Sequence, residues 1–368
     1  MRVLHFFPAN DDMITQHVNM LAERMGMESD NHLANNGQSA KVLLQQGLYD
    51  VLHLHGCWQN DMRSLVQLAL KKKVRLVVSP HGQLEPWVRN EHRWKEKLPK
   101  ELYYQHDIIR QAYAVIIQGR MEQECMERLG WNPRCVIIRN AIITHSITPT
   151  DMARQTFALY QKVIDSNPLE LMTDDTRQML LYLIKAGITG DARWLEDSAE
   201  PPVFPTLAHS QWRLLFCLAH QEHFTEVIQK GIRTLRMDTP DIDASQIAYF
   251  LPADYQDTES IVHVIGNQFV SENDRLLETF RLLRKWLSNG QLSIRHLIEL
   301  DKELRQYGCE EEALAEQLKD HKLYTLGCRL MQLMSEMTGL TEGFMPLPAL
   351  NDRTTRRWKQ QIEQHLKI

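Results

Sequence analysis

The chain has 368 residues, of which 43% are hydrophobic and 24% are charged. It is therefore long enough for two domains, each with its own core, and too apolar to be disordered. Its formal net charge of -5 excludes a globally basic protein, so no nucleic-acid partner is expected. Six scattered cysteines without a CxxC pair fit neither a disulfide framework nor a structural zinc site.

The first 140 residues alternate short apolar runs with helical patterns. Strands are expected at 3–7, 30–34, 51–54, 75–79, 114–118 and 135–139, with helices at 14–25, 39–46, 63–72, 93–111 and 121–129. This alternation is typical of βαβ units, and strands that are apolar on both faces indicate a parallel sheet covered by helices. A Rossmann-like α/β domain is therefore predicted over residues 1–150.

From residue 151 onward, apolar residues recur at helical spacing, and Ser271 with Asp274 marks a helix start. Only 247–251 and 261–265 fit a strand as well as a helix. A mainly α-helical domain is predicted over 151–368, with a proline-rich connector near 200–206. Segments 211–221 and 224–235 resemble a helical hairpin of the kind that stacks in arrays, although no repeat period is found. The polar tail 354–368 is predicted to cap the array or to bind a protein partner.

No apolar run reaches the ~18 residues that cross a bilayer. The first apolar run ends at Asp11 and Asp12 without a signal-peptide cleavage site. We therefore expect a cytoplasmic protein without a transmembrane segment, alternatively one that lies peripherally at the inner membrane face.

Several short motifs point to one family. They are DVLHLHGCW at 50–58, SPHG at 79–82, LEPW at 84–87, RWK at 93–95 and RNA at 139–141. Together they resemble the acceptor-side, N-terminal domain of the family 4 glycosyltransferases, which are two-domain GT-B enzymes that move a sugar from an activated donor. The resemblance covers residues 1 to about 150 and does not extend into the second half.

The resemblance implies that loops beyond the carboxyl ends of the strands bind an acceptor saccharide, free or lipid-linked. His81 is the first candidate, as the base for a sugar hydroxyl or as a hydrogen-bond donor. Gly82 would let the backbone approach the ligand, Trp87 would stack on a pyranose ring, and Glu85 would orient His81 or accept from a hydroxyl. The alternative is that His81 and Gly82 form a plain turn and Trp87 a packing anchor. The remaining candidates for substrate binding are His55, Arg93 and Asn140.

His53, His55 and Cys57 alternate along one strand and so point to the same side. No fourth ligand accompanies them, and the His-x-His-Gly run recurs in the resembling family without a metal. No metal site is therefore predicted; His53 is interpreted as a core histidine and His55 as a residue of the rim.

The donor-binding residues implied by the family, an Arg, a Lys and a Glu-x7-Glu pair near glycine-rich turns, are not found after residue 150. Glu303 and Glu311 have the spacing but not the surroundings, and Asp11 and Asp12 after the first strand would repel a diphosphate. No cofactor is predicted and no nucleotide-sugar site is identified.

Three functions stay open. The chain is a divergent glycosyltransferase of surface-polysaccharide biosynthesis that depends on a partner, or a module that binds the acceptor saccharide, or alternatively a non-catalytic scaffold built on a retired transferase domain. Cations after Trp87 would approach membrane headgroups, or would simply be solvated.

Overall fold

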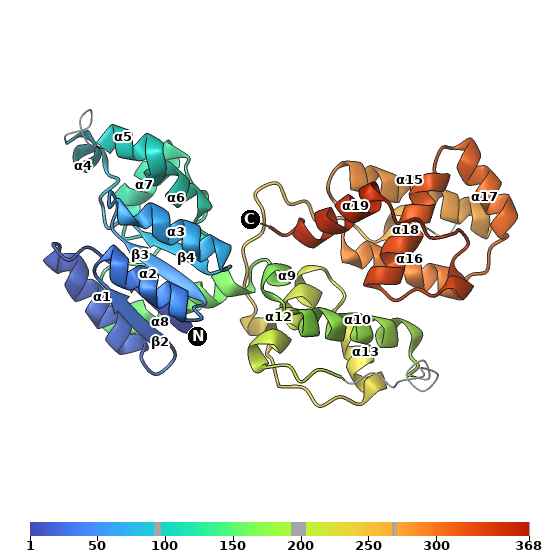
Figure 1. The fold of residues 1–368 in the computed structure, drawn as a ribbon, viewed down its shortest axis with the longest axis horizontal. Coiled ribbons are helices and arrows are strands. Elements are labelled where there is room, and N and C mark those ends of the chain that lie inside the picture. Colours follow the sequence, from blue (N-terminus) through green and yellow to red (C-terminus); the bar gives the residue numbers. More distant parts are fainter. Residues whose placement is uncertain (92–96, 193–203, 267–268, 270, 368) are drawn as a thin grey trace. The chain divides into compact units, whose positions relative to one another are not determined.

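The computed structural model describes residues 1–91, 97–192, 204–266, 269 and 271–367 (Figure 1). The chain forms two compact units. The first comprises residues 1–166 with 248–253, and the second comprises 167–247 with 254–367. The predicted Arg93, within the motif RWK, lies outside the described residues.

The first unit is built on one parallel sheet. Its strands are β1 (Arg2–Phe6), β2 (Asp30–Ala34), β3 (Val51–His55), β4 (Arg75–Ser79), β5 (Ala114–Ile117) and β6 (Cys135–Ile137). They lie in the order β2-β1-β3-β4-β5-β6, and every neighbouring pair is parallel. The predicted Rossmann-like sheet is confirmed, and all six predicted strands are present.

Helices connect these strands, and several of them begin or end at capping residues. They are α1 (Asp12–Met25), α2 (Gly37–Gln46), α3 (Asp61–Lys71), α4 (Pro86–Asn90), α5 (Leu98–Lys100), the π-helical turn η2 (Glu101–Gln105), α6 (His106–Gln111), α7 (Arg120–Leu129) and α8 (Pro149–Asp165). The side chain of Asp11 accepts from the Ile14 N–H at 3.0 Å and so caps α1. Gly130 ends α7 in the left-handed conformation, which glycine adopts without strain.

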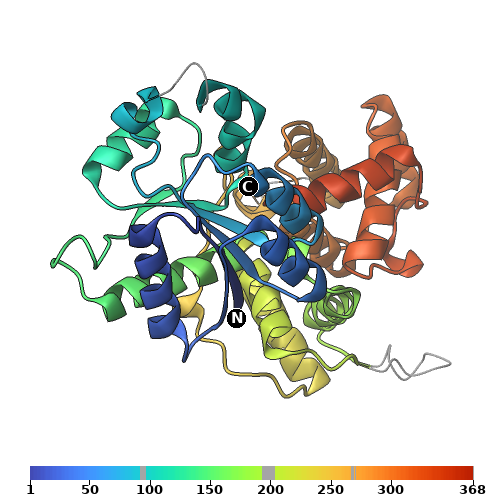
Figure 2. The same cartoon turned by 60° about the vertical axis from the view of Figure 1, so that its left-hand side comes forward.

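The two faces of the sheet bury different side chains, and Figure 2 shows helices on both sides of it. On one face, Leu52, Leu54, Leu76 and Val78 pack with apolar residues of α2, α3, α6 and α7. On the other face, a cluster that includes Val51 packs against α1 and α8. Successive strand residues point to opposite faces, so His53 and His55 lie on the α1/α8 face.

The described residues of the second unit form helices joined by turns and loops, without a strand. Its elements are α9 (Pro168–Leu171), α10 (Asp174–Thr189), α12 (His209–Gln221), α13 (Thr225–Leu235), the 3-10 turn η3 (Ala244–Gln246), α14 (Ile261–Ile265), α15 (Glu272–Ser288), α16 (Ile294–Gln306), α17 (Glu311–Asp320), α18 (Tyr324–Met337), the 3-10 turn η4 (Glu342–Phe344) and α19 (Arg353–Gln364). The predicted helical half is confirmed. Of the two ambiguous segments, 261–265 is a helix, whereas 247–251 is neither helix nor strand.

Glycines set the closest packing of the second unit, between α10 and α13. A Cβ on Gly187 would lie 2.0 Å from the Val227 carbonyl oxygen, and one on Gly231 would lie 2.2 Å from the Leu183 carbonyl oxygen. The two helix backbones can approach this closely only because neither glycine carries a side chain. A separate core of leucine, methionine and aromatic side chains, including Phe280 and Leu297, joins helices α15 to α19.

None of the described helices combines the length and the apolar character that a membrane crossing requires.

Candidate functional site at the carboxyl edge of the sheet

The sheet has one point at which its strand order reverses. Strands β1 and β3 are neighbours, while β2 lies beyond β1 and β4 lies beyond β3. In open α/β sheets, ligands bind in the crevice outside the carboxyl ends of the strands at such a switch point. The loops after β1, β3 and β4 therefore define the candidate site.

Histidines gather at this point. His5 in β1 pairs in register with His53 in β3, and His55 ends β3. All three side chains are fully buried on the α1/α8 face, where the same strands elsewhere carry valine. His17 of α1 and His81 of the loop after β4 complete a group of five, which we call the histidine cluster.

Three of these rings form an unbroken hydrogen-bonded chain. His5 Nε2 lies 3.3 Å from Asn31 Oδ1, and His5 Nδ1 lies 3.0 Å from His55 Nε2. His55 Nδ1 in turn lies 3.1 Å from His81 Nε2, and His81 Nδ1 lies 2.6 Å from Gln118 Nε2. Hydrogen bonds between imidazole rings thus link β1, the end of β3 and the loop after β4, which are distant in sequence.

The direction of this chain follows from its first member. The Asn31 amide nitrogen donates to the carbonyls of Ala22 and Ser29, which leaves its Oδ1 as an acceptor. His5 must then donate through Nε2 and accept at Nδ1, and a neutral imidazole has only one N–H. The same assignment passes along the chain, so each of the three rings carries its proton on Nε2 and the Gln118 amide donates to His81.

Burial keeps the cluster neutral. Desolvation lowers the pKa of His5 to about 4, despite the favourable hydrogen bond to Asn31. Desolvation also lowers the pKa values of His53, His55 and His81 well below the ordinary range, and neighbouring histidines add to the effect. If one ring of the cluster took up a proton, its positive charge would further disfavour protonation of the neighbouring buried rings.

The loop that carries His81 is held in an unusual conformation. His81 and Gly82 follow one another at φ angles of +52° and +76°, and only the glycine adopts this region without strain. The buried carboxylate of Glu122 fixes the loop. Its two oxygens accept from the Gly82 and Gln118 backbone N–H groups, each at 2.8 Å.

His81 is therefore not presented as a free base. Its side chain is only partly buried, but both ring nitrogens are engaged, one by His55 and the other by Gln118. A sugar hydroxyl could reach a ring nitrogen only after one of these partners moved away. His55, predicted on the rim, lies fully buried behind His81.

Glu85 and Trp87 are the better-placed candidates of this loop. Glu85 is only 7% exposed, and its Oε2 has no hydrogen-bond partner. Burial, and then the charge of Glu122, raise the pKa of Glu85. Trp87 is 58% exposed at the start of α4, so its ring is available to a ligand. A Cβ on Gly82 would lie 3.9 Å from Glu85 Oε1, which places this glycine beside the carboxyl group.

Asn140 adjoins the histidine cluster through His17. It is buried, its Oδ1 accepts from the Ile142 N–H at 2.9 Å, and its side chain hydrogen-bonds to His17. The sequence prediction named Asn140 but missed its partner His17, and missed His5 as well. His53 is a core histidine, hydrogen-bonded to Tyr160 Oη at 2.6 Å and to Ser79 Oγ at 2.7 Å.

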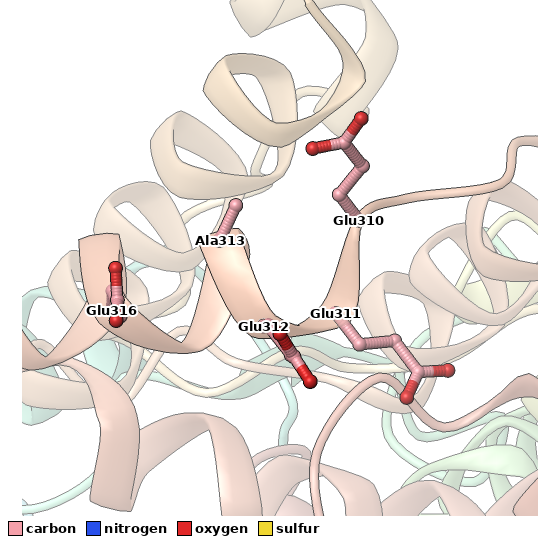
Figure 3. Close-up of a pocket in the computed structure, with 5 residues that line it drawn as sticks. All are labelled: Glu310, Glu311, Glu312, Ala313 and Glu316. Carbon is pink, nitrogen blue, oxygen red and sulfur yellow. The ribbon is translucent and has the colours of Figure 1, made fainter.

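Glu303 and Glu311, which have the Glu-x7-Glu spacing, each have a structural role in the second unit. Glu303 is buried and pairs with Arg275 at 2.7 Å, so this carboxylate already has its cation. Glu311 lies in the first turn of α17, where the helix dipole favours acidic groups. Figure 3 shows Glu310, Glu311, Glu312 and Glu316 pointing in different directions along this helix rather than toward one point. Both members of the Glu-x7-Glu spacing therefore have a local structural role.

The acidic residue Asp11 and two of the cations that follow Trp87 also have local roles. Asp11 caps α1, so a carboxylate oxygen already occupies the helix N-terminus after β1. Arg89 forms a bidentate pair with Glu101 at 2.6 and 2.9 Å, and Lys97 donates to the Val88 carbonyl. These two cations are thus engaged within the first unit.

The comparison with protein families agrees with the fold and with the motifs. Residues 17–141 match the model of the glycosyl transferase 4-like domain. This range contains the greater part of α1 and the strands from β2 to β6, and with them most of the histidine cluster. The first unit therefore carries a glycosyltransferase 4-like domain, as the N-terminal half of a GT-B enzyme does. No curated protein and no solved structure matches the chain.

Proposed function

We propose that the chain takes part in glycosyl transfer as the acceptor-binding component, and that a second protein supplies the nucleotide-sugar site. One observation carries the proposal. A glycosyltransferase 4-like domain covers residues 17–141, whereas the described residues of the second unit form helices and contain no second parallel sheet.

The chemistry of the loop after β4 supports a saccharide ligand. The unpaired Oε2 of Glu85 can accept from a sugar hydroxyl, and the exposed face of Trp87 can stack on a pyranose ring. An unpartnered buried carboxyl oxygen is costly unless something completes its hydrogen bonds. A hydroxylated ligand beside Trp87 would do so.

The helical unit would then dock the donor-binding partner, in surface-polysaccharide assembly or a related pathway, with a free or lipid-linked saccharide as acceptor. Peripheral contact with a membrane would bring the protein to a lipid-linked acceptor. This part of the proposal follows from the domain organisation, because an acceptor domain without a donor domain has no autonomous transferase activity.

The test measures saccharide binding and transfer separately. We expect glycan-array or calorimetric binding by the intact chain, and transfer from a nucleotide-sugar only when candidate partner proteins are added. Trp87→Ala should weaken binding by about 2–10-fold, since aromatic stacking contributes ~0.5–1.5 kcal/mol. Tyr103→Ala is the matched control, because Tyr103 is also an exposed aromatic residue, at 65%, but lies outside this loop.

Glu85→Gln separates ligand contact from folding. The amide keeps the shape of the side chain but loses the charged acceptor, and we expect about 10–100-fold weaker binding, in line with ~1.5–3 kcal/mol for a hydrogen bond to a charged group. If neither variant changes saccharide binding, or if no saccharide binds, the acceptor role is refuted and the scaffold alternative gains support.

A further inference from the structure

We propose that His17, His55 and His81 form a binding site for one divalent transition-metal ion, of which zinc is the best match. The three side chains come from α1, from the end of β3 and from the loop after β4. One ring nitrogen from each lies within 4.8 Å of the other two. Three imidazoles from three different elements thus meet at the switch point of the sheet.

The spacing of the first two ligand atoms already fits zinc. His55 Nδ1 and His81 Nε2 are 3.1 Å apart. Two nitrogen ligands of a tetrahedral zinc ion, each at ~2.0–2.1 Å from the metal, lie roughly 3.3 Å apart. The ion would lie to one side of the line between these two nitrogens, and the rings of His55, His81 and His17 would turn toward it. His81 would then carry its proton on Nδ1 in place of Nε2.

His17 supplies an independent reason to expect a ligand. Its side chain is buried, being 7% exposed, and its Nδ1 has no hydrogen-bond partner. Buried imidazole nitrogens are normally paired, because an unpaired one keeps its desolvation cost without compensation. A metal ion between His17, His81 and His55 would satisfy this nitrogen.

The outer partners of the three rings suit metal ligation. His55 Nε2 donates to His5 Nδ1, and His5 donates to Asn31, so the far side of the His55 ring already has the acceptor that a metal-bound histidine requires. His81 Nδ1 faces the Gln118 amide. A half-turn of that amide would present its oxygen, and His81 could then bind metal through Nε2 and donate through Nδ1.

A second triple, His5, His53 and His55, has ring nitrogens equally close together, but it is a poorer site. All three of its side chains are fully buried, and both nitrogens of His53 are taken by Tyr160 and Ser79. His81, by contrast, is only partly buried, so the proposed site lies closer to solvent than the second triple. Three histidines on that side leave the fourth zinc position open for water or a ligand hydroxyl.

Metal content and Co²⁺ spectroscopy test the site on the intact chain. After dialysis against Zn²⁺ and removal of free metal, we expect one zinc per chain. Co²⁺ in its place should give the visible absorption of a tetrahedral ion. His17→Leu should weaken metal binding by more than about 100-fold, because loss of an outer partner alone costs ~10–100-fold. His145→Gln, at an exposed position, should retain wild-type affinity.

The metal-free forms supply a check on folding. His17→Leu removes an unpaired buried nitrogen together with the hydrogen bond to Asn140, and these two changes oppose one another. Without metal the variant should therefore still unfold cooperatively, and only the wild type should gain thermal stability from added Zn²⁺. His5→Gln should bind metal about 10–100-fold more weakly through loss of the outer partner. Equal metal content in wild type and His17→Leu, or no metal retained by the wild type, would overturn the proposal.

Discussion

His296 makes the stability of the second unit depend on pH. Its ring is buried beside Trp286, with the ring centroids 4.2 Å apart. The Ser293 N–H donates to His296 Nδ1 at 3.1 Å, which closes the capping box of α16, and Thr258 Oγ1 lies 2.7 Å from Nε2. Only the neutral ring can accept at Nδ1 while it donates from Nε2. Burial, followed by the charges of Arg295 and His365, lowers the pKa of His296 to about 3.

The sign of the effect follows from proton binding. Below the ordinary histidine pKa of 6.5 the unfolded chain takes up a proton at this position, whereas the folded chain does not until the pH approaches 3. The stability that this neutral ring contributes is therefore fully present above pH 6.5. Below pH 6.5 the free energy of unfolding falls by ~1.4 kcal/mol per pH unit. Between pH 6.5 and pH 5 the loss from this one ring is about 2 kcal/mol.

His296→Gln isolates this contribution. A glutamine at the same position can accept from the Ser293 N–H, as in an ordinary capping box, but it does not titrate. We expect the variant to lose about 1 kcal/mol at pH 7 through weaker packing on Trp286. Between pH 6.5 and pH 5, however, it should lose about 2 kcal/mol less than the wild type does.

Urea unfolding at several pH values measures the difference, read by pulsed hydrogen exchange in peptides from α15 and α16 so that only the second unit is followed. Carboxylates contribute equally to both proteins and cancel. His209→Gln, at an exposed position, should show the pH dependence of the wild type. If His296→Gln and wild type lose stability in parallel as the pH falls, the buried ring is not neutral in the way its hydrogen bonds require.

Two further substitutions test packing and the loop of the candidate site. Gly187→Ala should destabilise the second unit by ~1–3 kcal/mol in urea unfolding, because the new methyl group would meet the Val227 carbonyl. Gly343→Ala, where a Cβ meets nothing within 4 Å, should change stability by less than ~0.5 kcal/mol, and equal effects would disprove the packing argument. Glu122→Gln should destabilise the first unit by ~1–3 kcal/mol, because an amide cannot accept from both backbone N–H groups that the carboxylate holds. Glu124→Gln, on the exposed side of the same helix, should leave the melting temperature unchanged, and so should Glu122→Gln if the clamp is unimportant.

The secondary structure was predictable because most elements carry local signals. The strands of the first unit are apolar runs between helical patterns, and Ser271 caps α15 through the Asp274 N–H as the sequence indicates. Where the signal was weak, the prediction stayed open. Segment 247–251 has the composition of a strand but pairs with none of the described strands, and Phe250 instead donates its N–H to Ser166 Oγ at 2.8 Å.

The site was predictable only in part, because its members are adjacent in space and not in sequence. The motif around His81 drew attention to the loop after β4, which lies at the switch point of the sheet. His5 and His17 carry no motif of their own, and they belong to the site only because β1 lies beside β3 and α1 covers the same face of the sheet. One signal was available: His5 interrupts an otherwise apolar strand, and a polar residue at a core position calls for a partner.

The fixed direction of the imidazole chain links the two proposals for the first unit. As long as Gln118 donates to His81 and His81 donates to His55, neither ring nitrogen of His81 is free to take a proton from a sugar hydroxyl. With a metal ion between His17, His55 and His81, the proton of His81 would lie on Nδ1 in place of Nε2. The Gln118 amide would turn so that its oxygen accepts from this N–H. The loop that carries Glu85 and Trp87 would then also carry His81 as a ligand of a metal with an open position. Acceptor binding measured with and without Zn²⁺ should therefore differ in the wild type, whereas in His17→Leu it should not; identical responses of the two proteins would separate the metal from the saccharide site.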